Sequence, residues 1–318
     1  MLATQNMLLG AHAMGLGTCL VGFAVSALKQ DPSILKRLKI PAGESVLGGA
    51  PFNVAWHLQA FGMAPLFISR VGDDPLGRRI RDTMHAWEMD ASGQQLDSTH
   101  PTGSVDISVE DGEPDFDILD KQAYDFIDPA AMPPLPGCAL LYHGSLAIRN
   151  AGSGHALQQL QQGRDLHRLV DVNLRPPWWQ RETVLELLQG ARWIKLNEAE
   201  LALLAGDAGA LQVQLQQLQQ HSGAELLIIT RGARGALVLT SSGEEFRVVP
   251  KSHATVIDTV GAGDAFTSVM MLGLLQGWTV PLMLERAQDF ASAITGLRGA
   301  TCSDPAFYRP FLDGWKLK

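Results

Sequence analysis

From about Gly48 onward, the sequence alternates between strand-like and helical patterns, and this alternation limits the folds available to the chain. Strands that alternate with helices form a parallel sheet, with helices packed against both of its faces. The predicted strands are residues 65–71, 139–143, 169–172, 193–196 and 226–230. The predicted helices are residues 51–61, 77–87, 154–166, 183–188, 198–204, 212–220 and 265–275. We therefore expect an α/β fold with a mostly parallel central sheet.

One segment departs from this pattern. Between Ser104 and Ile118, the apolar residues Val105, Ile107 and Val109 alternate with polar ones, and an Asp-Gly-Glu-Pro turn follows. Such alternation is typical of antiparallel strands that have one exposed face. We expect a small β lid at about residues 102–120, on the edge of the sheet.

The composition excludes several classes of protein. With 318 residues, of which 46% are hydrophobic and 18% charged, the chain is long enough for one large domain and a small accessory element. A net charge of −8 without a basic stripe argues against a nucleic-acid partner. The three cysteines are widely spaced and odd in number, which is typical of a reduced cytoplasmic protein. Most histidines, including His57, lie in helical stretches and are expected to be structural.

Residues 7–28 form an apolar run that resembles a membrane span at first sight. Four glycines divide this run into a helix and a short strand, and no basic segment precedes it. We expect a buried helix and strand here, and no membrane partner.

The segment Asp258–Phe266 contains a glycine turn and an unexpected acid. Residues 254–257 are β-branched and apolar, as in a buried strand, and residues 265–275 are apolar, as in a buried helix. Gly261 and Gly263 allow backbone amides to close on a ligand, and the start of a helix favours an anion. The turn lacks the Gly-Lys-Ser/Thr of a Walker loop and the third glycine of a dinucleotide site. An ordinary turn, in which Asp264 only complements the helix dipole, remains open.

The same residues, D-T-V-G-A-G-D-A-F, resemble the C-terminal signature of the ribokinase-like (PfkB) sugar kinases at every fixed position. This resemblance implies a ribokinase-like three-layer α/β/α fold with a small β lid. It also implies that Asp264 takes the proton from a sugar hydroxyl as general base. The amides of Gly261, Ala262 and Gly263 would form an anion hole, and Asp258 would lie near a monovalent cation such as K⁺.

A second signature precedes the first predicted helix. The sequence G-G-A-P-F-N-V-A, from Gly48 to Ala55, resembles the N-terminal sugar-kinase signature in the form found in fructokinases. The resemblance implies that Gly48 and Gly49 hinge the lid and that Asn53 contacts the sugar. Without the resemblance, a simple helix start with Pro51 in its first turn explains the pattern.

Three further motifs resemble the nucleotide side of these kinases. In the N-x-x-E motif, Asn197 would border ATP and Glu200 would hold Mg²⁺ through water, although a capping box explains the same spacing. In the T-x-G-x-x-G turn, Thr230 and Gly232 would border the ATP phosphates. In the D-x-N-x-R segment, Asn173 would contact ATP and Arg175 would reach a phosphate or the sugar. A surface arginine that follows a strand is the alternative for Arg175.

The resemblance to sugar kinases covers roughly residues 45–318. The N-terminal strand of these kinases, with its Gly-Glu pair and sugar-binding Asp, has no match in the preceding residues. Residues 1–46 instead resemble a C-terminal fragment of a nitroreductase-family flavoprotein, comprising an apolar helix, a short strand and a second helix. The fragment lacks most of a flavin site, so we expect no FMN. The predicted domains are residues 1–46 and 47–318.

Together, the motifs predict an ATP-dependent, Mg²⁺-requiring kinase that converts fructose to fructose 6-phosphate, with a sugar and ATP as its small-molecule partners. The alternatives are a kinase of the same fold acting on 2-keto-3-deoxygluconate or ribose, or a catalytically impaired binding protein. Pairing of two lids into a homodimer is also expected from the resemblance.

Overall fold

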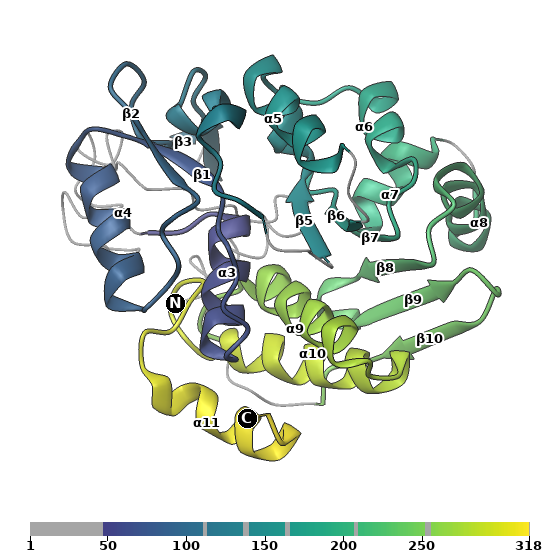
Figure 1. Ribbon diagram of the computed structural model, residues 1–318. Coiled ribbons are helices and arrows are strands. Elements are labelled where there is room, and N and C mark those ends of the chain that lie inside the picture. The colour runs from purple at the N-terminus through teal and green to yellow at the C-terminus, as the bar shows by residue number, and fades with distance from the viewer. Residues whose placement is uncertain are drawn as a thin grey trace. The chain divides into compact units, whose positions relative to one another are not determined.

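The computed structural model describes residues 47–110, 113–135, 140–162, 166–206, 209–251 and 256–317. The chain divides into two compact units (Figure 1). The first contains the described parts of Met1–Pro133, Thr255–Ala265 and Ile294–Lys318, and the second those of Pro134–Ala254 and Phe266–Ala293. The predicted N-terminal fragment, the apolar run at residues 7–28, Cys19 and Cys138 lie outside the described residues.

The second unit is built on a six-stranded sheet with the strand order β10-β9-β8-β7-β6-β5. Its strands are β5 (Leu140–Gly144), β6 (His167–Asp171), β7 (Trp193–Asn197), β8 (Leu226–Thr230), β9 (Ala236–Thr240) and β10 (Glu245–Val248). Strands β5 to β8 are parallel, and β9 and β10 are antiparallel to their neighbours. The prediction of a mostly parallel sheet is therefore confirmed.

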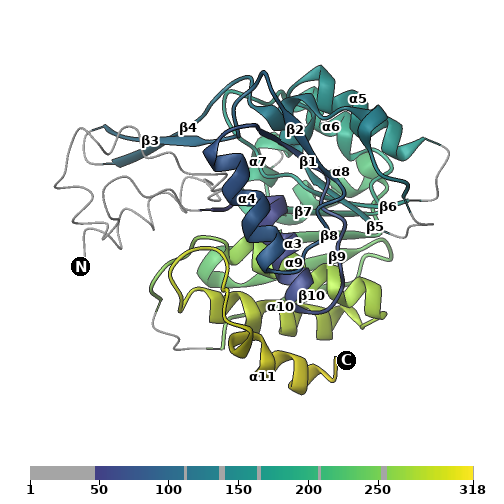
Figure 2. The same ribbon diagram turned by 60° about the vertical axis from the view of Figure 1, so that its left-hand side comes forward.

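Helices cover both faces of this sheet. They are α5 (Ala151–Gln161), α6 (Arg181–Leu188), α7 (Glu198–Ala205), α8 (Leu211–Ser222), α9 (Ala262–Gln276) and α10 (Val280–Ile294). Apolar side chains of β6 to β9 pack with those of α6, α7 and α8 in one buried cluster. Figures 1 and 2 show α9 and α10 on the opposite face. Helix α9 begins in the first unit and continues in the second.

The first unit contains a second, smaller parallel pair. Strands β1 (Ser69–Gly72) and β2 (Gln94–Asp97) are joined by helix α4 (Pro75–Ala86), whose first amides are capped by the Asp74 side chain. Helix α3 (Ala50–Ala60) packs against them through Phe52, Ala55 and Trp56. Helix α11 (Pro305–Trp315) completes the described helices of this unit.

The antiparallel pair expected between residues 104 and 118 is present. Strands β3 (Val105–Glu110) and β4 (Glu113–Ile118) pair in register from Val105 with Ile118 to Glu110 with Glu113. Its function as a lid stays a prediction. In the described part of the chain, no helix is long and apolar enough to cross a membrane.

The predicted strand at residues 254–257 was wrong where the structure describes it. Val256 and Ile257 belong to no strand, and 47% and 57% of their surfaces are exposed. The backbone N–H groups of Ile257 and Asp258 both donate to the carbonyl of Thr295, just beyond α10, at 2.8 and 3.1 Å. These backbone N–H groups thus bond to a carbonyl that follows a helix, and not to a neighbouring strand as the β-branched residues had predicted.

Candidate active site

Asp264 and Asn53, from the two predicted signatures, meet in the first unit. The Nδ2 atom of Asn53 in α3 donates to Oδ2 of Asp264 in the first turn of α9, at 2.7 Å. Both residues are buried, with 0% and 8% of their surfaces exposed. The bond holds the carboxylate in one orientation, and the helix start favours its negative charge.

The other polar atom of Asn53 is also informative. Among the described residues, no donor bonds to its Oδ1 atom, although the atom is buried. A buried amide oxygen without a partner is costly, so this position suits the hydroxyl of a ligand. Gly48 and Gly49 lie directly before this helix, and the Gly49 carbonyl accepts the backbone N–H of Asn53 at 2.8 Å. Their predicted hinge role stays a prediction.

Gly261 forms the tightest backbone contact of the glycine turn. Its φ angle is 76°, and a Cβ atom there would lie 2.4 Å from Cα of Ala300. Only glycine permits both this conformation and this approach. Of the amides predicted to form an anion hole, that of Ala262 donates to the Thr259 carbonyl at 3.3 Å and so closes the turn. The hole formed by Gly261, Ala262 and Gly263 stays a prediction.

Asp258 connects this turn to the segment at residues 299–302. Its Oδ1 atom accepts the N–H of Val260 at 3.0 Å, and its Oδ2 atom accepts the N–H of Gly299 at 3.0 Å. The observed contacts of Asp258 therefore brace the loop. Its predicted place beside a monovalent cation stays a prediction.

Two contacts from α3 to the same segment were not predicted from the sequence. Nε2 of His57 lies 3.1 Å from the Ala300 carbonyl, and Nδ1 lies 3.0 Å from the Tyr308 hydroxyl. Burial lowers the pKa of His57 to about 3. Nε1 of Trp56 donates to the Cys302 carbonyl at 2.8 Å. The signal in the sequence was a histidine on a mostly apolar helix.

The second unit brings the nucleotide-side motifs together at one edge of its sheet. In the parallel register, Gly144 lies opposite Asp171, and Asn197 lies opposite Thr230. These residues stand at the carboxyl ends of β5 to β8, which is where open α/β sheets bind ligands. Polar groups of the nucleotide-side motifs therefore gather at one edge of this sheet.

Glu200 forms the capping box that its spacing suggested. Asn197 Oδ1 accepts the N–H of Glu200 at 2.9 Å, and Glu200 Oε2 accepts the N–H of Asn197 at 2.8 Å. The second oxygen, Oε1, accepts the N–H of Leu174 at 2.9 Å. Burial raises the pKa of this carboxyl group. A carboxylate offers about four lone pairs, so the remaining ones fit a water bound to Mg²⁺.

The turn with Thr230 and Gly232 is tied to the same helix. Arg231 and Arg234, on either side of Gly232, both form ion pairs with Glu198, the first residue of α7. Gly232 has a φ angle of 58° and begins a short 3₁₀ turn, Gly232–Arg234. The two motifs predicted to border ATP are therefore held together.

Arg175 is buried, so the alternative interpretation of Arg175 as a surface residue was wrong. Only 7% of its surface is exposed, and Nη1 donates to the Leu174 carbonyl at 3.1 Å. Among the described residues, no acceptor bonds to Nη2. Asn173 has a φ angle of 44°, and its carbonyl lies 3.5 Å from the Ser145 hydroxyl. Asn173 and Arg175 therefore lie in an irregular turn that follows β6.

A buried ion pair near this edge was also missed. Nζ of Lys195 lies 3.0 and 2.9 Å from the two carboxylate oxygens of Asp171. Thr267 of α9 adds a hydrogen bond of 3.3 Å to the same carboxylate. An acid in one predicted strand and a lysine in the next were the signal for this pair.

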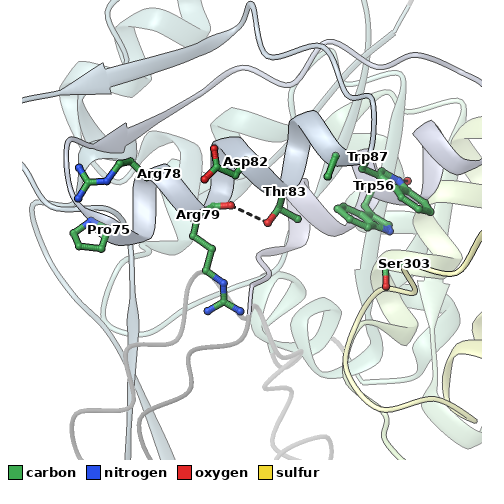
Figure 3. Close-up of a pocket in the computed structure, with 9 residues that line it drawn as sticks. Trp56, Pro75, Arg78, Arg79, Asp82, Thr83, Trp87 and Ser303 are labelled. Atoms are coloured by element: carbon green, nitrogen blue, oxygen red, sulfur yellow. Dashed lines mark hydrogen bonds between the residues drawn. The ribbon is translucent and has the colours of Figure 1, made fainter.

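A pocket of about 630 Å³ lies elsewhere in the first unit. Figure 3 shows the indole rings of Trp56 and Trp87 side by side, and the side chains of α4 along the pocket wall. The two rings stack with centroids 4.5 Å apart. No predicted site residue lines this pocket, so its position does not mark the predicted site. The lining residues are Trp56, Pro75, Arg78, Arg79, Asp82, Thr83, Ala86, Trp87 and Ser303.

The comparisons with known proteins agree with the motifs. Residues 26–306 match the pfkB family carbohydrate kinase. The chain belongs to this family. A fructokinase from Klebsiella pneumoniae is 30% identical over 290 residues, which are 86% of this chain and 93% of the relative. An aminoimidazole riboside kinase from Salmonella typhimurium is 29% identical over 250 residues, which are 75% of this chain and 77% of the relative.

A solved structure supports the fold. The crystal structure of fructokinase from Vibrio cholerae O395, in its fructose, ADP and calcium ion bound form, is 26% identical. It matches with a TM-score of 0.72 over 84% of this chain and 92% of that chain. The ribokinase-like fold is confirmed, and the chain is an ATP-dependent carbohydrate kinase by its family.

The comparisons also correct the predicted limits of the resemblance. The family match begins at residue 26, not near residue 45, and so includes part of the segment compared with a nitroreductase. The nitroreductase resemblance is not borne out. The division into domains at residues 46 and 47 stays a prediction.

Proposed function

We propose that this carbohydrate kinase transfers the γ-phosphoryl group of ATP to the primary hydroxyl of fructose, which gives fructose 6-phosphate and ADP. The fructokinase relative from Klebsiella pneumoniae and the fructose-bound structure from Vibrio cholerae support this choice of sugar. The observation that carries the proposal is the contact between Asn53 and Asp264. It places an oriented carboxylate beside a buried acceptor for a hydroxyl group.

Asp264 acts as the general base. As the hydroxyl oxygen attacks the γ-phosphorus, its proton passes to the carboxylate of Asp264. The new O–P bond forms while the bond from the γ-phosphorus to the bridging oxygen breaks, and ADP leaves. Phosphoryl transfer depends mainly on such positioning and on stabilisation of charge. Asn53 keeps the carboxylate in place and accepts a hydrogen bond from a sugar hydroxyl through Oδ1.

The residues of the second unit bind the nucleotide. Thr230, Gly232, Asn173 and Asn197 border ATP, and the buried Arg175 supplies its open Nη2 atom to a phosphate or the sugar. Magnesium that arrives with ATP would be held through water by Glu200 and would neutralise phosphate charge.

The test is ADP release with fructose, ribose, 2-keto-3-deoxygluconate and aminoimidazole riboside, for the wild type and for Asp264→Asn. We expect fructose to give the highest kcat/KM and the substitution to lower kcat about 10²- to 10⁴-fold, the range for loss of a general base. Glu182→Gln is the matched control, because it removes an exposed acid from the first turn of α6. This control should leave kcat unchanged.

Three other outcomes would revise the proposal. Fructose turnover that survives Asp264→Asn would overturn the base assignment and favour an acid that only complements the helix dipole. A higher kcat/KM for another sugar would replace fructose but keep the base. ATP binding in calorimetry without turnover of any sugar would favour the catalytically impaired binding protein.

A further inference from the structure

We propose that His57 is a positioning residue for phosphoryl transfer. It bonds to the Ala300 carbonyl and thereby keeps Gly261 of the loop Asp258–Asp264 in place. This inference rests on the proposed function of the loop. His57 is fully buried in α3, and both of its ring nitrogens have partners in the first unit.

The first step concerns the proton on the ring. A carbonyl oxygen only accepts hydrogen bonds, so the contact of 3.1 Å with Ala300 requires a proton on Nε2. Nδ1 is then an acceptor for the Tyr308 hydroxyl at 3.0 Å, and the single proton of this hydroxyl is shared with the Cys302 carbonyl at 3.2 Å. The low pKa of His57 agrees with a neutral ring that carries one proton. A neutral, buried ring with both nitrogens engaged is suited to holding its neighbours, not to exchanging protons with a substrate.

The second step leads from Ala300 to the loop. Ala300 is 5% exposed, and its Cα atom lies where a side chain on Gly261 would begin. The backbones of the two residues are therefore in direct contact, and a shift of Ala300 is passed to Gly261. Gly261 in turn accepts the N–H of Ala265 at 2.8 Å, so its position sets the start of the helix that carries Asp264.

The third step is the spacing along α3. Asn53 and His57 are four residues apart, so they lie on the same face of the helix. One bonds to the carboxylate of Asp264, and the other bonds to the segment that supports the loop. The helix thereby sets the orientation of the base and the position of the glycine turn together. Trp56 and Asp258 add contacts to Cys302 and Gly299, and in the described part of the chain only the side chain of His57 bonds to Ala300.

Two substitutions of His57 by an amide side chain test its two ring nitrogens separately. The side-chain nitrogen of glutamine is as many bonds from the backbone as Nε2 of histidine, so His57→Gln keeps a donor to Ala300. The oxygen of asparagine matches Nδ1, so His57→Asn keeps an acceptor for Tyr308 and loses the donor. We expect kcat for the best sugar to fall about 10- to 100-fold in His57→Asn, as for a misplacement of about 1 Å. In His57→Gln, kcat should stay within about threefold of the wild type.

The Michaelis constant for ATP provides a second measurement. A misplaced loop acts on the transfer step, so KM for ATP should change less than about twofold in His57→Asn. Met84→Ala, which opens a cavity at a fully buried position of α4, is the control for lost stability. It should lower Tm and leave kcat unchanged well below Tm.

The outcomes separate this inference from the proposed function. No turnover by the wild type would mean that the proposed function fails, irrespective of His57. With an active wild type, equal kcat values for His57→Asn and His57→Gln would overturn the positioning role. A loss of kcat in Met84→Ala as large as that in His57→Asn would also overturn it, because general destabilisation would then explain both.

Discussion

The loop Asp258–Asp264 in the first unit and the strand ends in the second unit are held by contacts of very different range. Asn53 bonds to Asp264 across 211 residues, and His57 bonds to Ala300 across 243. Around the strand ends, Asn197 bonds to Glu200 across three residues, and Lys195 bonds to Asp171 across 24. The longest contacts of the loop span more than 200 residues, whereas the bond from Thr267 to Asp171 at the strand ends spans 96.

Because of this difference in range, we expect substitutions in the two units to change different measured quantities. A change in α3 or in residues 299–302 should move the loop, so it should appear in kcat. A change near β6 or β7 should remove a local bond within a packed sheet, so it should appear in the free energy of unfolding.

The largest effect is expected from Lys195→Met in the second unit. The substitution leaves Asp171 as a buried charge, 2% exposed, without its ion-pair partner. Loss of one partner from a buried pair costs about 3–5 kcal/mol, because the remaining charge stays desolvated. Urea denaturation would measure this decrease in the free energy of unfolding.

Lys251→Met is the matched control for this prediction. Lys251 also contacts two carboxylates, at 2.7 and 3.0 Å, but 65% of its side chain is exposed. Exposed ion pairs contribute little to the free energy of unfolding, so the denaturation midpoint should not change measurably. If Lys195→Met kept its stability and lost kcat instead, the local pair would serve the reaction, and the contrast between the units would fail.

The next effect is expected from Gly261→Ala in the first unit. The new Cβ atom would lie 2.4 Å from Ala300, so the loop or residues 299–302 must shift. We expect kcat to fall about 100-fold, which equals about 2.7 kcal/mol, since displacement of reacting groups by about 1 Å has this effect. Steady-state kinetics with the best sugar would measure the loss.

Gly277→Ala separates steric contact from backbone strain. Gly277 also has a positive φ angle, 67°, but nothing lies within 4 Å of a Cβ atom placed there. This variant should lose about 1–2 kcal/mol of stability from the left-handed conformation and keep its kcat. A similar loss of kcat in both variants would show that strain alone, without Ala300, accounts for the result.

The contrast in range also explains what the sequence could predict. The Asn-x-x-Glu spacing of residues 197–200 predicted the capping box, because a cap is formed within one helical turn. The apolar runs predicted the parallel strands, because β6, β7 and β8 are largely buried. The signatures predicted Asp264 and Asn53 as site residues, and their direct contact emerged only in three dimensions.

The remaining features depend on partners that no local pattern specifies. His57 lies in a helix whose apolar periodicity does not depend on whether the Ala300 carbonyl accepts a hydrogen bond from the ring. The β-branched residues before Asp258 predicted a strand, but the Thr295 carbonyl takes the amides of Ile257 and Asp258 instead. Arg175 was open to interpretation as a surface residue, because its burial depends on the turn after β6.

The smallest effect concerns pH and is expected in both units. Burial lowers the pKa of His57 to about 3 and that of His143, in β5, to about 4. Unfolding returns each imidazole to a pKa near 6.5, so the unfolded state binds more protons between these values. The stability contributed by each neutral histidine is therefore complete above about pH 6.5 and is lost as the pH falls toward the folded-state pKa.

Between pH 7 and pH 5, each histidine should account for about 2 kcal/mol of lost stability, measured by urea denaturation at several pH values. His57→Gln and His143→Gln should each flatten the pH dependence by this amount, whereas His155→Gln, at an exposed position, should not. Equal flattening in the two units would show that burial alone sets this effect, whatever the range of the contacts. The contrast between the units would then concern catalysis and not the titration of buried groups. A flat pH dependence in the wild type would contradict burial of neutral histidines, and with it the assignment of the Nε2 proton that links His57 to Ala300.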